Sequence, residues 1–339
     1  MEPTLYIHVG PPKTATTYLQ NSFLSKLKGI DCIVRPRVKI GGHSIYLHRL
    51  FVYSVDIWSD VGREVFKKVS KNSIDNGRDL IISSEGFYGG FSVPRPWYKS
   101  RAKNLTNRVN GLWSTSGSPY ADTFARHLEE LRGVSRDIGF KELKMVGTMR
   151  RQDQKMASGY AEMSSSIKGA SQEHFEEWVS YILESPTGYY GLGGSKLDYY
   201  SWWVKSTQKI GRENVLILPV ELLNEDKNLF LKKWMKFLNL KDESVYDRVD
   251  ESKKRTNCGG ENVWYLRPPS RSLDSLPQRI MSKIGAKKII GKFFGTRFRG
   301  KKIELKKSTI NKILEKYKES NKKMDKVIGK VSLKKHKYF

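Results

Sequence analysis

The stretch from Tyr6 to Gln20, YIHVGPPKTATTYLQ, decides the fold because its pattern changes from strand to helix across one short turn. The apolar run that ends at Val9 predicts a buried strand, and Leu19 and Phe23 recur at helical spacing after it. Gly10 permits a tight bend between the two. The first N–H groups of a helix have no partner within the helix, so we expect this turn to bind an oxyanion such as a phosphate.

The residues after the bend carry groups that suit an oxyanion. Lys13 offers an ammonium, and Thr14, Thr16 and Thr17 offer three hydroxyls. A plain strand-to-helix turn with a threonine cap is the alternative, but one threonine suffices for a cap, so the pattern favours the anion site. A nucleoside triphosphate loop has the form G-x-x-x-x-G-K-[ST]. This turn is shorter and lacks the Gly-Lys pair, so we interpret it as a relative of the P-loop.

Length and composition favour one large domain over residues 1–339. The chain has 339 residues, of which 38% are hydrophobic, enough for a substantial core. No stretch approaches the roughly 20 apolar residues of a membrane span, and no basic-then-apolar leader precedes the first strand. Cys32 and Cys258 have neither a disulfide framework nor the spacing of metal ligands. We therefore expect a soluble, cytoplasmic protein with no metal site.

The chain is strongly basic. Its formal net charge is +27, and Lys283 to Lys337 contains 20 basic residues against four acids, which is +16 of the total. A polyanion or an anionic membrane surface is one explanation of this charge. Solvation of exposed helix faces by lysine is the other, and the composition does not decide between them. No feature points to a specific nucleic acid or to an oligomeric state.

Strands alternate with helices along the chain. Beyond the first strand, apolar runs predict strands at 31–35, Asp79 to Gly86, Leu143 to Arg150 and Asn214 to Glu221, and helical spacing predicts helices at 45–51, 61–69, 120–131, 152–165, 172–183, 197–209, from 224 and from 308. This alternation predicts an α/β fold with three layers, in which helices flank a mainly parallel sheet as in P-loop NTPases. Ligands of such sheets bind at the carboxyl ends of the strands, where Lys13, Glu85 and Arg150 are expected.

Two segments interrupt the alternation. Residues 86–119 are rich in glycine, proline, serine, arginine and aromatic side chains, which is typical of a long functional loop. Residues 253–339 form a basic C-terminal extension, irregular up to about Gly300 and ending in a helix whose apolar stripe predicts that it docks onto the body.

The second informative stretch is VGTMRRQDQKMASGYAEM, from Val146 to Met163. Arg150 ends a strand, and Ser158 follows eight residues later, about two turns into the next helix. A guanidinium and a hydroxyl so placed can bind one phosphate together. Alone the spacing is weak, since Arg150 could pair with a carboxylate and Ser158 could be a small residue at a helix contact.

Together the two stretches resemble the sulfotransferases that use 3'-phosphoadenosine 5'-phosphosulfate (PAPS), and most of all their bacterial-type branch. The family's 5'-phosphosulfate loop, K-x-G-T-[ST], matches Lys13 to Thr17 with Ala15 in place of glycine, and its 3'-phosphate motif, R-x-x-x-x-x-x-x-S, matches Arg150 and Ser158. The resemblance continues through ISSEGF, NVLILPVELL and YKESNKKM, whereas the late K-G-x-x-G loop is only faintly matched by KKRTNCGG. It implies a cofactor site made of Gly10, Pro12, Lys13, Thr14, Ala15, Thr16, Thr17, Arg150 and Ser158.

The resemblance also implies an activity. It implies in-line transfer of a sulfuryl group from PAPS to a hydroxyl or amine of a carbohydrate or small-molecule acceptor, and the acceptor can be anionic. The donor leaves as adenosine 3',5'-bisphosphate (PAP). Lys13 would neutralise the departing phosphate. Glu85 is the candidate base because carbohydrate-type members carry a catalytic glutamate at that position, and a helix cap or an ion pair with Arg150 is its alternative role. His43, in the sequence GGHS, is the second candidate, although a lone histidine is more often structural.

Two other functions remain as alternatives. A P-loop nucleotide kinase is disfavoured by the missing G-K-[ST] ending, and a non-catalytic polyanion-binding protein is disfavoured by the two spaced anion motifs. Adenine needs an aromatic or apolar wall, and we assign none, because most of the clustered aromatic residues at 199–203 are expected in the core.

Overall fold

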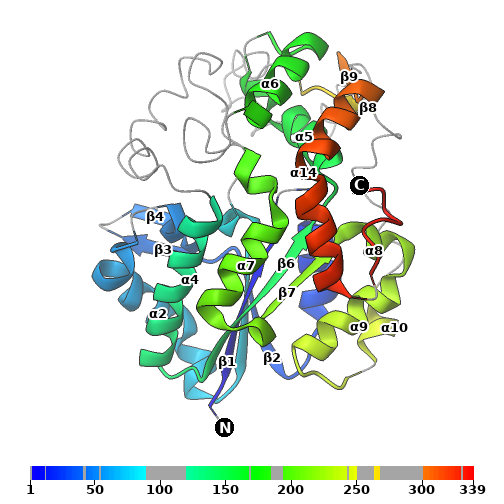
Figure 1. Cartoon of the computed structure of the whole chain (residues 1–339). Coiled ribbons are helices and arrows are strands. Elements are labelled where there is room, and N and C mark those ends of the chain that lie inside the picture. The colour runs from blue at the N-terminus through cyan, green and yellow to red at the C-terminus, as the bar shows by residue number, and fades with distance from the viewer. Residues whose placement is uncertain are drawn as a thin grey trace, which may run out of the picture.

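A parallel sheet of five strands forms the centre of the computed structural model of the chain (Figure 1). The structure describes residues 2–11, 13–40, 43–52, 55–88, 120–167, 169–184, 194–242, 244–249, 263–267, 301–329 and 331–339. The sheet has the order β2-β5-β1-β6-β7, made of β1 (Thr4–Val9), β2 (Ile30–Val34), β5 (Asp79–Ser83), β6 (Glu142–Met149) and β7 (Val215–Pro219).

The first strand lies in the middle of the sheet. β1 pairs with β5 on one side and with β6 on the other, so that His8 is opposite Ser83 and Val9 is opposite Gly147. The five strands of this sheet run parallel, and their carboxyl ends therefore meet at one edge. This edge points upward in Figure 1, toward α5 (Gln152–Met163).

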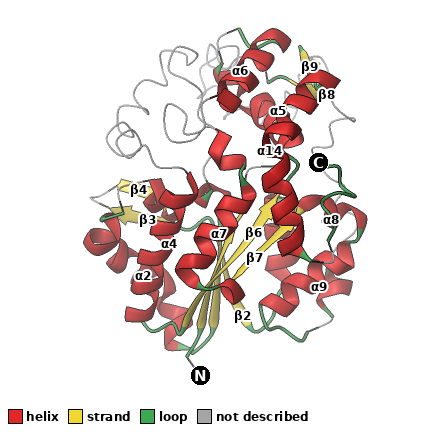
Figure 2. Cartoon of the chain, viewed as in Figure 1, coloured by secondary structure: helices red, strands yellow, loops and turns green. Residues whose placement is uncertain are grey.

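Helices cover both faces of the sheet (Figure 2). Leu5 and Ile7 of β1 face a cluster that includes α2 (Arg63–Asp75), α4 (Tyr120–Asp137) and α7 (Tyr199–Ile210). Tyr6, between them in sequence, faces the other cluster, formed with α1 (Thr16–Tyr18), η1 (Leu19–Phe23), α8 (Val220–Glu225), α9 (Lys227–Phe237) and α10 (Val245–Arg248). Because side chains alternate across a strand, this pattern makes three layers. The predicted α/β fold with a parallel sheet between helices is confirmed.

The remaining elements surround this core. They are η2 (Leu24–Lys26), β3 (Arg37–Ile40), β4 (His43–Tyr46), η3 (Leu47–Val52), η4 (Trp58–Gly62), η5 (Glu85–Phe87), η8 (Ser164–Ser166), α6 (Gln172–Glu184), η9 (Gly194–Leu197), η10 (Arg212–Asn214), β8 (Val263–Tyr265), β9 (Lys302–Glu304) and α14 (Lys307–Ile328). β3 pairs with β4, and β8 pairs with β9, each in an antiparallel ribbon.

The last helix docks onto the body, as the apolar stripe predicts. Ile313, Tyr317 and Met324 of α14 are buried. Asn321 is fully buried and exchanges two amide hydrogen bonds with Gln152 of α5, at 2.7 and 3.1 Å. The C-terminal helix is therefore part of the core packing.

Two predicted helices differ from the structure in type or in number. The helix expected at 45–51 is instead the end of β4 followed by η3, because Ile45 pairs with Val38 across the β3–β4 ribbon. The helix expected from 224 is two helices, since α8 ends before Asp226, whose carboxylate caps α9 by accepting from the N–H of Leu229. Most of the 86–119 insertion, and residues 253–262 and 268–300 of the extension, lie outside the described residues.

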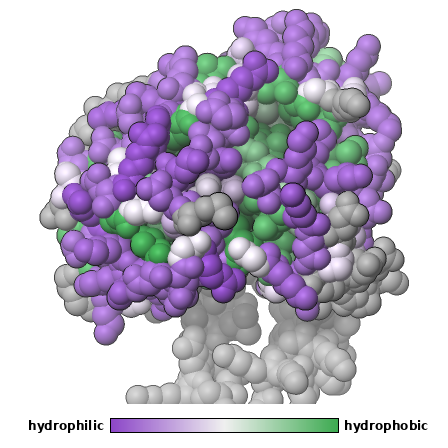
Figure 3. All heavy atoms as spheres, turned by 90° about the horizontal axis from the view of Figure 1, so that it is seen from below, coloured by the Kyte–Doolittle hydropathy of each residue, from purple (hydrophilic) through white to green (hydrophobic). Residues whose placement is uncertain are grey.

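The underside of the molecule is covered mainly by hydrophilic side chains, with smaller hydrophobic areas between them (Figure 3). Within the part of the chain that the structure describes, no helix combines the length and apolar character that crossing a membrane requires.

Candidate functional site

The turn after β1 is tied to the neighbouring strand β6 by threonine hydroxyls. The hydroxyl of Thr14 lies 2.7 Å from the carbonyl oxygen of Pro11 and 2.7 Å from the hydroxyl of Thr148 in β6. Thr14 and Thr148 are both fully buried. The turn is therefore held against the carboxyl end of β6.

Three hydroxyls converge on Gly10. A Cβ atom at this position would lie 2.6 Å from the hydroxyl oxygen of Thr148, 2.9 Å from that of Thr16 and 3.0 Å from that of Thr14. No side chain fits there. The Thr16 hydroxyl is buried and has no hydrogen-bond partner among the described residues. A buried hydroxyl without a partner costs about 1–3 kcal/mol, so an oxygen of a bound ligand would complete this arrangement.

The backbone of the turn takes a conformation that side chains disfavour. Lys13 has φ 73° and Ala15 has φ 59° and ψ 15°, both in the left-handed region. The helical segment that follows runs through α1, η1 and η2. Ala15 thus has the conformation that glycine adopts most readily, although it replaces the glycine of the K-x-G-T-[ST] pattern.

Arg150 joins the turn from the end of β6. Its Nη1 donates to the carbonyl oxygen of Lys13 at 3.1 Å, and its own carbonyl oxygen accepts from the Tyr199 hydroxyl at 2.7 Å. The two predicted anion motifs therefore meet in space.

One face of α5 is directed at the turn. Lys155, Ser158 and Glu162 are spaced by three and four residues and so share a face. Glu162 lies 3.3 Å from the ammonium of Lys13 and 3.3 Å from Arg267. Ser158, which is buried, lies on this face between the other two. The structure thus brings Lys13 and Arg150 together, and it places Ser158 on the face of α5 that carries Glu162, the partner of Lys13.

Lys155 is a member of the site that the sequence analysis missed. Its side chain is buried, and burial lowers the pKa of its ammonium to about 7. The positive charges of Arg150 and Lys13 act in the same direction, whereas Glu162 and Glu85 oppose them. The signal in the sequence was a lysine one turn before Ser158 on a helix face already assigned to phosphate binding.

Glu85 lies at the same edge, directly beyond β5. Ser84 caps the short η5 turn by accepting from the N–H of Gly86 at 3.3 Å. The Glu85 carboxylate lies 3.0 Å from Nη2 of Arg35. The ion pair weighed for Glu85 therefore exists, with Arg35 as the partner instead of Arg150.

The structure describes the side chain of His48 but not that of His43. His43 begins β4, and its side chain lies outside the described residues, as does all of Pro12. His48 was not predicted; its Nδ1 lies 2.8 Å from the Ser84 hydroxyl, and its ring leaves no room for a Cβ on Gly86. Burial lowers the pKa of His48 to about 4, and the charges of Arg49 and Arg35 add to this, so His48 is neutral near pH 7.

The clustered aromatic residues of α7 divide between core and surface. Tyr199 and Trp202 are fully buried, as expected for core residues, whereas Tyr200 and Trp203 are partly exposed. Among the described residues, no group of three or more His, Cys, Asp or Glu side chains is placed to hold a metal ion.

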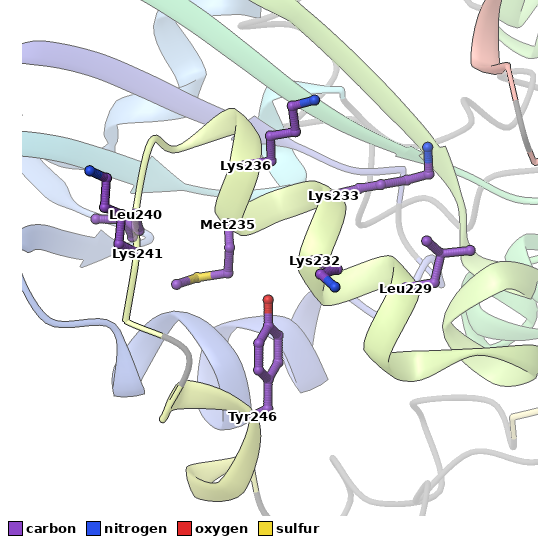
Figure 4. A pocket seen from close by; sticks show the side chains of 8 residues that line it. All are labelled: Leu229, Lys232, Lys233, Met235, Lys236, Leu240, Lys241 and Tyr246. Carbon is purple, nitrogen blue, oxygen red and sulfur yellow. The ribbon is translucent and has the colours of Figure 1, made fainter.

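A separate hollow of about 460 Å³ lies along α9 (Figure 4). It is lined by Leu229, Lys232, Lys233, Met235, Lys236, Leu240, Lys241 and Tyr246. Leu240 lies 4.0 Å from the position of a Cβ on Gly29, which immediately precedes β2. The hollow is therefore at the amino end of the sheet, away from Lys13 and Arg150.

Comparisons with known proteins give distant similarities. No family model matches the chain, and no curated protein is significantly similar. A sulfotransferase from Alicyclobacillus acidocaldarius aligns with a TM-score of 0.43 and 14% identity, over 75% of this chain and 87% of that one. A mouse sulfotransferase complexed with PAP aligns with a TM-score of 0.39 and 11% identity, over 77% and 70%. The sulfotransferase domain of the Synechococcus PCC 7002 olefin synthase aligns with a TM-score of 0.29 and 14% identity, over 75% and 82%. All three TM-scores lie below 0.5, so none of these alignments supports a conclusion about this chain.

The left-handed conformation of Ala15 leads to a prediction. Ala15→Gly should raise the free energy of unfolding by up to about 1 kcal/mol, because glycine adopts this conformation without the cost of a Cβ. Chemical denaturation of both proteins measures the difference. Ala125→Gly in α4 is the matched control and should lower stability by at least about 1 kcal/mol, as glycine does within a helix. Loss of stability in Ala15→Gly would show that the turn does not require this conformation.

Proposed function

We propose that the chain is a PAPS-dependent sulfotransferase, which transfers a sulfuryl group to a hydroxyl or amine of a carbohydrate or small-molecule acceptor. The observation that carries the proposal is the convergence of the two motifs. Lys13 and Arg150 meet near the buried hydroxyl of Thr16, which has no hydrogen-bond partner among the residues that the structure describes. The residue pattern of both motifs resembles that of the PAPS-dependent family.

The residues of the turn fit a phosphate group. The space beside Gly10 that a Cβ would fill is bordered by three hydroxyls, and the hydroxyl of Thr16 lacks a partner among the described residues. In the proposed site, the 5' end of PAPS is held by Gly10, Pro12, Lys13, Thr14, Ala15, Thr16 and Thr17, and the 3'-phosphate by Arg150 and Ser158. PAPS supplies the activated sulfuryl group, and PAP is the product that leaves.

Lys13 is the residue we assign to charge neutralisation on the departing phosphate. Its ammonium lies 3.3 Å from Glu162, so the side chain is already held against α5. A preorganised cation stabilises negative charge without the cost of reorienting solvent.

Glu85 is the residue we assign to removal of the acceptor's proton, with His43 as the second candidate. The parallel register sets the end of β5 beside the end of β1, so Glu85 follows the strand next to the one that carries the Lys13 turn. The charge of Glu85 acts on Lys155, as does that of Lys13, which places both near one buried side chain. Arg35 fixes the carboxylate through an ion pair. A bound acceptor would have to compete with Arg35 for this carboxylate.

The positive charge of the chain supports the acceptor part of the proposal. The +16 between residues 283 and 337 suits an acceptor with acidic groups, or contact with an anionic membrane surface. Much of this segment lies outside the described residues, and α14 exposes lysines such as Lys323 and Lys326 opposite its buried stripe.

One experiment separates this function from a nucleotide kinase and from a polyanion-binding protein. Thermal unfolding is followed with PAP, with ATP and magnesium, and with heparin, because a ligand that binds the native state raises its apparent stability. We expect PAP to give the largest shift in the unfolding temperature at equal concentration. A shift with ATP and magnesium alone would favour the kinase.

Lys13→Ala should remain folded, and its rate of sulfuryl transfer should fall by about a hundredfold or more, as when one preorganised donor is removed. Activity of Lys13→Ala within a few-fold of the wild type would remove Lys13 from the mechanism.

The 3'-phosphate assignment predicts a selective loss of binding. Arg150→Ala should weaken the binding of PAP by about 1.5–3 kcal/mol, the range for charge-assisted hydrogen bonds. The binding of adenosine 5'-phosphosulfate, which lacks the 3'-phosphate, should be weakened much less. Isothermal titration with both ligands measures this. Arg63→Ala is the control, since Arg63 pairs with Asp137 on the surface. Equal losses for both ligands would place Arg150 elsewhere in the site.

The base assignment predicts a split between binding and turnover. Glu85→Gln keeps the shape of the side chain and removes the proton acceptor, so the affinity for PAP should persist while kcat falls by roughly a hundredfold to ten-thousandfold. His43→Gln should have a mild effect. Steady-state kinetics with an acceptor identified by mass spectrometry tests both variants, and the reverse pattern would assign the base to His43.

A further inference from the structure

A short ribbon from the basic C-terminal extension is fixed beside α5 and α6. The ribbon consists of β8 and β9, and Ile303 of β9 is fully buried. Gln172, the first residue of α6, holds the backbone of Glu304 through both groups of its amide. Its Nε2 donates to the carbonyl oxygen of Glu304 at 3.0 Å, and its Oε1 accepts from the N–H of Glu304 at 2.7 Å. This part of the extension therefore has a defined place next to the candidate site.

Arg267 follows β8 and is attached to α5 through its backbone. Its N–H donates to the hydroxyl of Ser164 at 2.7 Å, and this buried hydroxyl donates to the carbonyl oxygen of Ala161 at 2.8 Å. Ser164 lies two residues beyond Glu162, and the guanidinium of Arg267 contacts the Glu162 carboxylate. The backbone attachment thus sets the position from which the arginine side chain extends to Glu162.

Glu162 contacts two cations through a single oxygen atom. Its Oε1 lies 3.3 Å from the ammonium nitrogen of Lys13 and 3.3 Å from Nη2 of Arg267. One carboxylate cannot neutralise two cations, so the three side chains together keep a positive charge. Without Arg267, the carboxylate would cancel the charge of Lys13, which is the charge that we assign to the departing phosphate.

We propose that Arg267 is a positioning residue for sulfuryl transfer and that it acts through Glu162. Arg267 compensates the charge of Glu162, so that Glu162 can hold Lys13 in place while the charge of Lys13 stays available to a bound anion. The role in transfer rests on the proposed function, whereas the effect on anion binding at the turn does not. The proposal gives the ribbon of the C-terminal extension a part in the site that is separate from attraction of an acceptor.

Independent charges would produce some of the same behaviour. Any cation near the turn favours a bound anion and any carboxylate disfavours it, so a single substitution does not separate the two explanations. Additivity does separate them. Independent charges have independent effects, whereas an arginine that acts through Glu162 has little effect once Glu162 is neutral. A double-mutant cycle is therefore the test.

The cycle consists of Arg267→Met, Glu162→Gln and the double variant. Isothermal titration measures the affinity for PAP at low ionic strength, where partly exposed charges are least screened. We expect Arg267→Met to weaken binding by about threefold to tenfold and Glu162→Gln to strengthen it by a similar factor. In the Glu162→Gln background, Arg267→Met should change the affinity by less than about twofold. Arg267→Lys, which keeps the charge, should restore most of the affinity.

The same cycle has a kinetic readout. Arg267→Met should lower kcat by about threefold to tenfold, because the charge on Lys13 is then cancelled by Glu162. Adding Glu162→Gln should restore kcat, since glutamine keeps the shape of the side chain and an oxygen that accepts from Lys13 but carries no charge. A loss of packing at Arg267 would not be rescued by a change at Glu162.

Two surface ion pairs supply matched controls. Arg63→Met and Glu129→Gln remove charges that pair with Asp137 and Lys209, and both should leave the affinity for PAP unchanged. Thermal unfolding checks that each variant folds, which we expect because the Arg267 and Glu162 side chains are 55% and 35% exposed.

The outcomes separate this role from the proposed function. PAP binding with additive effects of Arg267→Met and Glu162→Gln, or with wild-type affinity and kcat in Arg267→Met, would overturn the role of Arg267 and leave the proposed function standing. Inorganic pyrophosphate is the second probe. If the wild type binds pyrophosphate but not PAP and the cycle is non-additive, the charge compensation stands and the proposed function fails. Absence of binding to both probes would overturn both.

Discussion

The contact between the hydroxyls of Thr14 and Thr148, 2.7 Å apart, is the constraint on which the candidate site depends. It fixes the turn after β1 to the end of β6, and it forces glycine at position 10, where any Cβ would enter the space of three hydroxyls. Because β1 is the central strand, this one attachment sets the position of the turn relative to both neighbours. Arg150 then needs only to extend from the end of β6 to contact the carbonyl oxygen of Lys13.

The sequence predicts those parts of the structure that local patterns determine. Strand β1, the turn and the Arg150 to Ser158 interval are each written in one short stretch, where apolar runs, helical spacing and glycine have direct physical meaning. The parallel sheet follows from the alternation of such stretches. The helix expected at 45–51 failed because pairing of Ile45 with Val38 overrides the helical spacing, and local pattern carries no information on pairing.

The neighbours of the site residues could not be predicted, because they depend on segments far apart in the chain. Arg35 pairs with Glu85 across 50 positions, and Arg267 contacts Glu162 across 105 positions. Lys155 is different: its place on the face of Ser158 was readable, but its burial depends on what packs over α5. The roles of Lys13, Glu85, His43, Arg150 and Ser158 stay predictions.

The C-terminal segment also supports the site through hydrogen bonds and packing. Asn321 of α14 bonds to Gln152 and to the carbonyl oxygen of Tyr338, and the Tyr338 hydroxyl donates to Glu221 at 2.8 Å. Glu221 in turn accepts from the N–H of Arg151, next to Arg150. The end of the chain thus braces the start of α5, where the proposed 3'-phosphate contacts begin. We expect removal of this segment to shift Arg150, even though the exposed lysines of the segment lie elsewhere. Charge changes on the surface of α14 therefore separate attraction of an acceptor from support of the site more cleanly than a truncation does.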